Sequence, residues 1–137
     1  MAYRIRRVDY FYATVNDEPG EAYQLLAHLA GLGINLLAFN AVPMGPMRTQ
    51  LTIFPEEAPL LIAAAHKAGW HLDGPHHAML VQGDDELGAL AQIHMKVYEA
   101  QVNISASSGV ADGRGGFGYI LYLRPEQFER AACALGL

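Results

Sequence analysis

The strongest constraint on the fold is an internal repeat with a spacing of 68 residues. Residues 15–36 (VNDEPGEAYQLLAHLAGLGINL) have the pattern of a strand end, an acidic turn, an amphipathic helix and the start of a second strand. The repeat places Asp17 on Asp85, Gly20 on Gly88 and Asn35 on Asn103 without a gap. The sequence therefore predicts two copies of one structural unit, 1–75 and 76–137.

Each copy is predicted to be a small α+β unit. In the first copy, apolar alternation indicates strands at 8–15, 34–42, 47–54 and 70–74, and helical spacing indicates helices after residue 19 and at 55–68. In the second copy, the strands are expected at 78–82, 102–110 and 117–123, and the helices at 86–100 and from Pro125 onward. The order β-α-β-β-α-β predicts a ferredoxin-like fold, with helices on one face of an antiparallel sheet of strand order 4-1-3-2.

The second copy lacks a fourth strand of its own, because Leu137 aligns with Gly69 of the first copy. Its first strand would then be an exposed sheet edge, which favours association with other chains. Residues 3–7 alternate in the manner of a strand, and we hypothesise that they fill this edge. Two half-length units bury little surface alone, so we expect the two halves to share an interface.

Composition excludes several classes of function. The net charge of −5 disfavours a nucleic-acid-binding surface, which requires clustered Lys and Arg. No apolar run is long enough to span a bilayer, and no signal peptide is recognised. Cys133 is the only cysteine, which precludes an internal disulfide and fits a reducing compartment. We expect a cytoplasmic protein that binds neither nucleic acid nor membrane.

The duplicated turn is the candidate site. A helix start offers free backbone N–H groups to a carboxylate, and a glycine beside it lets a ligand approach. An acidic side chain or an Asn can then pair with an ammonium group. Topology is expected to bring the Asn after each helix close to the turn. The candidate ligand-binding residues are Asp17, Glu18, Pro19, Gly20 and Asn35 in the first copy and Asp85, Glu86, Leu87, Gly88 and Asn103 in the second. The alternative is that each acid caps its helix and each Asn shapes a turn.

The sequence D-E-P-G, followed by a Leu-rich helix and G-I-N-L, resembles the signature of the ACT domain family. The second copy departs from it, with Leu87 where Pro is usual and Gln101 at the position of Gly33. The resemblance implies a regulatory, allosteric protein without catalytic activity. It also implies domains that pair edge to edge and bind an amino acid or a related metabolite at an interface between repeats or subunits.

From these features we expect a freestanding tandem ACT protein, because 137 residues leave no room for a fused enzyme domain. Its expected partners are a small-molecule amino acid, a second copy of the chain in a homodimer or higher homo-oligomer, and a regulated enzyme that the sequence does not identify. No catalytic residue, metal site or cofactor is predicted. Clustered histidines at 66, 71, 76 and 77 lack the fixed spacing of metal ligands.

Two other functions stay open at this stage. One is a small enzyme of ferredoxin-like fold that uses His94 or Tyr98, and the other is an assembly module that binds no ligand. His94 stands where the first copy has Leu26 and is expected to bond to backbone at a rim. The glycine-rich segment 109–118 lacks the Gly-Lys-Ser/Thr of a phosphate-binding loop and is interpreted as a mobile hairpin loop.

Overall fold

The computed structural model describes residues 3–137, which form two compact units. The N-terminal unit is Asp9–His76, and the C-terminal unit combines residues 3–8 with His77–Leu137. The elements are β1 (Tyr3–Asn16), α1 (Glu21–Gly31), β2 (Leu36–Pro43), β3 (Arg48–Pro55), α2 (Ala58–Ala68), β4 (Asp73–Asp84), α3 (Ala89–Glu99), β5 (Ala106–Ala111), β6 (Gly116–Tyr122) and α4 (Pro125–Ala134).

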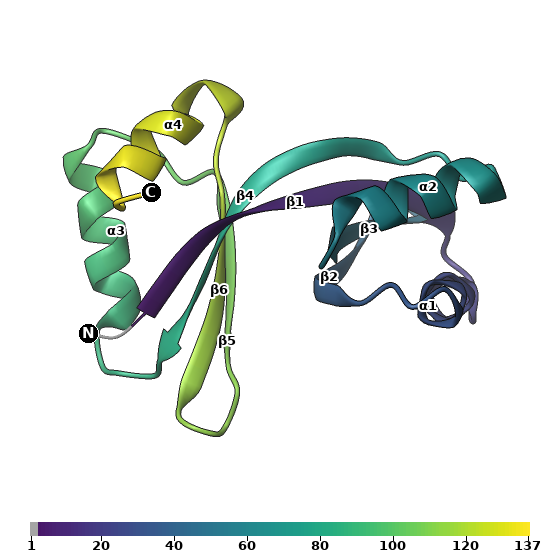
Figure 1. Ribbon diagram of the computed structural model, residues 1–137, viewed down its shortest axis with the longest axis horizontal. Coiled ribbons are helices and arrows are strands. Elements are labelled where there is room, and N and C mark those ends of the chain that lie inside the picture. Colours follow the sequence, from purple (N-terminus) through teal and green to yellow (C-terminus); the bar gives the residue numbers. More distant parts are fainter. Residues whose placement is uncertain (1–2) are drawn as a thin grey trace. The chain divides into compact units, whose positions relative to one another are not determined.

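In the N-terminal unit the strand order is β2-β3-β1-β4. Strand β3 pairs antiparallel with β1 and with β2, and Phe11 lies opposite Ile53. Helices α1 and α2 cover one face of this sheet (Figure 1). Their inner faces meet β1 and β3 in a buried core, because every second strand residue points to the same side. This core contains Phe11, Leu29, Ile34, Leu51, Ile53 and Leu61.

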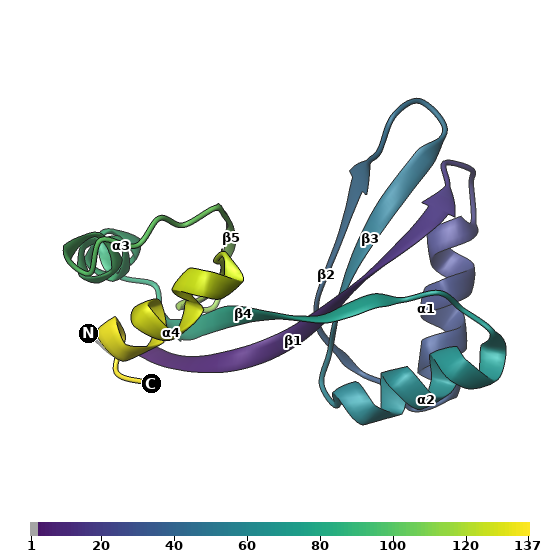
Figure 2. The ribbon, with the colours of Figure 1, turned by 90° about the horizontal axis from the view of Figure 1, so that it is seen from above.

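In the C-terminal unit the strand order is β1-β4-β6-β5, with only the start of β1 taking part. Strand β6 pairs antiparallel with β4 and β5. Helices α3 and α4 cover one face of this sheet (Figure 2). Ile93 and Val97 of α3 and Ala131 and Ala132 of α4 pack on that face with Met79, Val81 and Leu121. The predicted order 4-1-3-2 is thus confirmed in both units, as is the α+β ferredoxin-like class.

Residues 3–8 stand in for the missing fourth strand of the C-terminal unit, as hypothesised. Tyr3 and Ile5 pack against its core. Arg7 donates two hydrogen bonds to the carboxylate of Glu129 on α4, at 2.6 and 3.1 Å. Lys96 Nζ on α3 donates to the Tyr3 hydroxyl at 3.0 Å. Strand β4 is therefore flanked on both sides, which removes an edge that would favour aggregation.

Several predicted boundaries are wrong. The strands predicted at 70–74 and 78–82 are one strand, β4, because the segment lies beside β1 and pairs with β6 along its later part. These pairings override the turn preference of Gly74-Pro75. Strand β5 begins at Ala106 instead of 102, after a turn in which Ser105 bonds to Tyr122. Helix α3 begins at Ala89 instead of 86, because the preceding residues form the turn described below.

Candidate functional site

The duplicated turns have the same backbone attachment in both units. The Asp17 N–H donates to the carbonyl of Met47, between β2 and β3, at 2.9 Å. The Asp85 N–H donates to the carbonyl of Gly115, between β5 and β6, also at 2.9 Å. All four residues obey the 68-residue repeat. The turn is therefore held against the neighbouring hairpin in each unit.

Each turn ends in a glycine that starts the next helix. Gly20 precedes α1 with φ of 89°, and Gly88 precedes α3 with φ of 81°. This left-handed conformation strains any residue with a Cβ. Pro19 therefore lies in the turn that precedes α1. No side-chain hydrogen bond caps either helix, so the alternative that the acids are hydrogen-bonded caps is wrong.

In the C-terminal unit the turn forms one wall of a pocket of about 590 Å³, which we call the turn pocket. Residues 85–91 line it from the turn and the first turn of α3. The opposite wall is the β5–β6 hairpin, through residues 109–111, Phe117 and Gly118. Asp85, Glu86, Leu87 and Gly88, all sequence-predicted site residues, thus lie together around one cavity.

The turn pocket combines groups of opposite polarity. The N–H of Ala89 donates to Glu86 O, and the first intrahelical bond joins Gln92 N–H to Gly88 O at 3.1 Å. The N–H groups of Leu90 and Ala91 lie between these two bonds, have no earlier helical carbonyl to bind, and carry the positive end of the helix dipole. Asp85 and Glu86, which line the same cavity, contribute two carboxylates. The arrangement suits a ligand that carries both a carboxylate and an ammonium group.

The first copy differs at the same place. Residues 17–20 do not line the turn pocket of the C-terminal unit. They also do not line the cavity of the N-terminal unit, which lies over β1. The first copy matches the family signature more closely than the second copy does. The cavity nevertheless lies beside the turn of the second copy. The hairpin beside the second turn has smaller residues than its counterpart, because Gly118 takes the place of Gln50 and Gly109 the place of Ala41.

The prediction that Asn35 and Asn103 join the turn of their own copy is wrong. Helix α1 has 11 residues and so separates its two ends by about 16 Å. Asn35 lies at the far end, where its Nδ2 donates to Glu56 Oε2 at 2.8 Å. The N–H of Asn103 donates to Gln127 Oε1 at 3.4 Å, beyond the end of α3. Asn35 thus bonds to the segment that precedes α2, and Asn103 bonds to α4.

A hydrogen-bonded polar pair, His94 and Tyr119, joins α3 to β6. His94 Nε2 hydrogen-bonds the Tyr119 hydroxyl, not backbone as predicted. A Cβ on Gly109 would lie 2.7 Å from Tyr119 Cδ1, so the tyrosine ring occupies the space above this glycine. In the first copy the corresponding residues are apolar or larger: Leu26, Leu51 and Ala41. The two copies differ at all three of these positions, and this combined difference in the sequence could have revealed the pair.

The hairpin wall of the pocket is ordered by an acidic side chain. Gly109 and Gly118 lie in strands β5 and β6, so the interpretation of 109–118 as a mobile loop is wrong. Asp112 Oδ1 accepts hydrogen bonds from the N–H groups of Arg114 at 2.6 Å and Gly116 at 3.0 Å. These bonds hold the pKa of Asp112 below its usual value, because they favour the carboxylate.

The histidines of the predicted cluster lie on different elements. His66 is on α2, His71 follows that helix, and His76 and His77 are on β4. Within residues 3–137 no group of three or more His, Cys, Asp or Glu side chains is arranged to hold a metal ion. Over the same residues, every helix is too short or too polar to cross a bilayer.

Comparison with known proteins identifies the fold. No protein-family model and no curated protein sequence matches the chain. Among solved structures, protein BT0572 from Bacteroides thetaiotaomicron aligns with a TM-score of 0.80 and 14% identity, over 96% of this chain and 88% of that one.

Two regulatory subunits of aspartate kinase are also similar. The subunit from Thermus thermophilus aligns with a TM-score of 0.66 and 17% identity, over 97% of this chain and 93% of that one. The subunit from Thermus flavus aligns with a TM-score of 0.60 and 17% identity, over 98% and 93%. At these identities the likeness establishes the fold, which is a tandem pair of ferredoxin-like repeats.

Proposed function

We propose that this protein is a regulatory protein that binds an α-amino acid in the turn pocket of its C-terminal unit. The observation that carries the proposal is that two acidic residues, Asp85 and Glu86, line the same cavity as the start of α3, where N–H groups are open. The α-carboxylate binds those N–H groups, and the α-ammonium binds the acidic side chains. Gly118, where a Cβ would meet nothing within 4 Å, leaves the backbone of the opposite wall accessible.

The similarity to regulatory subunits of aspartate kinase supports this role, because the fold extends over nearly the whole of both chains. Those proteins are named as regulatory subunits of a kinase, and we propose that this chain likewise acts on an enzyme and has no catalytic activity of its own. The ligand shifts the state of a partner enzyme by its differential affinity for the two states. Neither the amino acid nor the enzyme is specified by these residues.

We also propose that a second copy of the chain covers strand β5. All six residues of β5 are exposed, and β5 is the outermost strand of its sheet. The sequence ASSGVA has no Lys or Pro, the residues that normally protect an edge. Val110 is 73% exposed and also lines the turn pocket, so pairing at this edge would close the pocket.

The test is a thermal-shift panel of the twenty amino acids on the purified chain. A ligand that binds only the folded protein stabilises it by about 2.7 kcal/mol at one hundred times its Kd. Gly118→Val is the blocking variant, because Gly118 lines the turn pocket. A Cβ at this position meets nothing within 4 Å, so the substitution causes no clash with the rest of the protein. Asp85→Asn removes one carboxylate of the ammonium site.

Two controls match these variants. Gly31→Val adds the same volume at a glycine of the N-terminal unit whose Cβ also meets nothing within 4 Å and which does not line the turn pocket. Asp17→Asn removes the corresponding acid of the first copy. We expect Gly118→Val and Asp85→Asn to abolish the shift and both controls to retain it. No shift with any amino acid would leave the assembly module as the better description, and turnover of one would make the protein an enzyme.

A further inference from the structure

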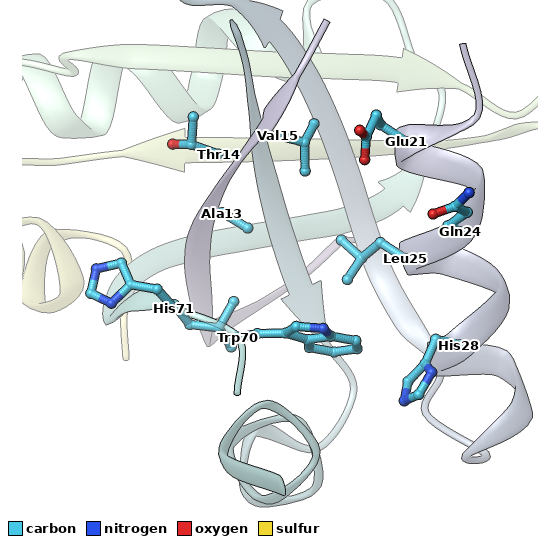
Figure 3. Close-up of a pocket in the computed structure, with 10 residues that line it drawn as sticks. Ala13, Thr14, Val15, Glu21, Gln24, Leu25, His28, Trp70 and His71 are labelled. Carbon is cyan, nitrogen blue, oxygen red and sulfur yellow. The ribbon is translucent and has the colours of Figure 1, made fainter. Parts of the chain in front are cut away.

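The N-terminal unit contains a separate cavity of about 400 Å³ over the end of β1. We call it the groove pocket. Helix α1 forms one wall and the segment after α2 forms another (Figure 3). It shares no residue with the turn pocket, and none of the sequence-predicted site residues lines it.

The position of Trp70 in the groove pocket is set by the end of α2. Gly69 ends that helix with φ of 74°, and the Trp70 N–H donates to Ala65 O at 2.9 Å. The His28 ring packs against the Trp70 ring edge-on, with centroids 4.9 Å apart. The indole is therefore held in one place by contacts with both helices, and its ring borders the cavity.

The polar side chains of the groove pocket come from α1. Glu21, Gln24 and His28 project from the helix toward the cavity, on the same side as Leu25 (Figure 3). The Glu21 carboxylate has no hydrogen-bond or ion-pair partner among residues 3–137. No Lys or Arg lines the cavity. The remaining wall is largely apolar and includes Val15.

This combination favours a cation over an anion. A carboxylate without a partner attracts an ammonium group, and an indole ring adds cation–π attraction. The absence of a lining Lys or Arg leaves nothing of fixed positive charge to bind a carboxylate. A zwitterionic amino acid, which suits the turn pocket, would place its own carboxylate close to Glu21.

We infer that the groove pocket is a second ligand site, which binds a small organic amine with an apolar body. The ammonium lies at Glu21, and the apolar body lies between Leu25 and the Trp70 ring. The site is independent of the turn pocket and of the function proposed for it.

Trp70 is the only tryptophan of the chain, so its fluorescence reports on this cavity alone. The probes are phenethylamine, phenylacetate and phenylalanine, which share an aromatic body and differ in charge. We expect a saturable change with phenethylamine, and half-saturation at about five- to tenfold higher concentration for the other two. No saturable change, or equal responses to amine and carboxylate, would overturn the inference.

Variants that change the charge near Glu21 test where the ammonium group of the amine binds. Gln24→Arg places a cation beside Glu21, and we expect it to abolish the phenethylamine response. Gln92→Arg is the matched control, because Gln92 is the exposed equivalent of Gln24 in the second copy. Glu21→Gln should raise the half-saturation concentration about fivefold. Glu126→Gln, which removes a first-turn carboxylate from α4, should not change it.

The two sites are separated by one further variant. Gly118→Val, which blocks the turn pocket, is expected to leave the phenethylamine response of Trp70 unchanged. Failure of the amino acid panel together with a normal Trp70 response would overturn only the function proposed above. An unaltered response in Gln24→Arg would overturn only the amine site.

Discussion

Gly109 and Tyr119 lie opposite each other in the β5–β6 ladder, and a Cβ on residue 109 would lie 2.7 Å from Tyr119 Cδ1. Real Cβ contacts are not this short, so the observed position of the tyrosine ring requires a glycine at residue 109. Tyr119 is buried at 5% exposure, and its hydroxyl bonds to His94. The first copy has Ala41, Leu51 and Leu26 at these positions, so the second copy has changed all three together.

The first prediction concerns Gly109. Gly109→Ala should destabilise the protein by about 1–3 kcal/mol, because the buried ring has to move. Gly118→Ala is the matched control, since a Cβ there meets nothing within 4 Å. Urea unfolding of both variants measures the difference. An unchanged midpoint for Gly109→Ala would show that the ring is free to move at no cost.

The second prediction concerns the His94–Tyr119 hydrogen bond. Tyr119→Phe and His94→Leu should each cost about 1 kcal/mol, because each leaves one polar group without its partner. The double variant should cost less than the two single costs added together, by about 0.5–1.5 kcal/mol. A double-mutant cycle in urea measures this coupling. Strict additivity would mean that the bond contributes nothing to stability.

The third prediction concerns residues 3–8 and the C-terminal unit. Ile5→Ala should destabilise the protein by about 1–2 kcal/mol, the lower end for an isoleucine that is only partly buried. Arg4→Ala, at an exposed neighbouring position, should have almost no effect. Removal of residues 1–7 should expose the edge of β4 and cause aggregation visible by light scattering. A monomeric truncated protein of unchanged stability would contradict this role.

The fourth prediction concerns the pH dependence of the β5–β6 turn. The folded pKa of Asp112 lies below its unfolded value, because the N–H groups of Arg114 and Gly116 favour the carboxylate. Its stabilisation is therefore complete above the ordinary Asp pKa of about 4 and is lost as the pH falls through the lower folded value. An NMR titration should give a carboxyl midpoint below that of a model peptide. A midpoint at or above the model value would disprove the two bonds.

The fifth prediction concerns the glycines that start α1 and α3. Gly20→Ala and Gly88→Ala should each cost about 1–2 kcal/mol, although a Cβ at either position meets nothing within 4 Å. The cost is conformational, since both residues have positive φ. Asn tolerates this region better than Ala, so Gly20→Asn and Gly88→Asn should lose less. Equal stability of the Ala and Asn variants would point to a different cause.

Local features of the sequence were sufficient to predict the two copies and their strand order. Apolar periodicity identified α1 and β6, and the acidic turns were located correctly before both helices. The hypothesis about residues 3–7 also followed from the sequence, because a count of strands left one edge uncovered. These inferences depend on residues that are close in the chain or related by a fixed spacing.

The placement of side chains around each site depended on distant residues. The predicted contact between Asn35 and the turn at Gly20 does not form, because these residues lie at opposite ends of the 11-residue helix α1. Sequence periodicity also does not show that a cavity accompanies the second turn, because the opposite wall of that cavity comes from the β5–β6 hairpin. The repeat and its turn chemistry were determined by the sequence itself, through local backbone preferences. Which turn borders a cavity, and where Trp70 meets α1, was decided only by tertiary packing, because each cavity is formed between elements far apart in the chain.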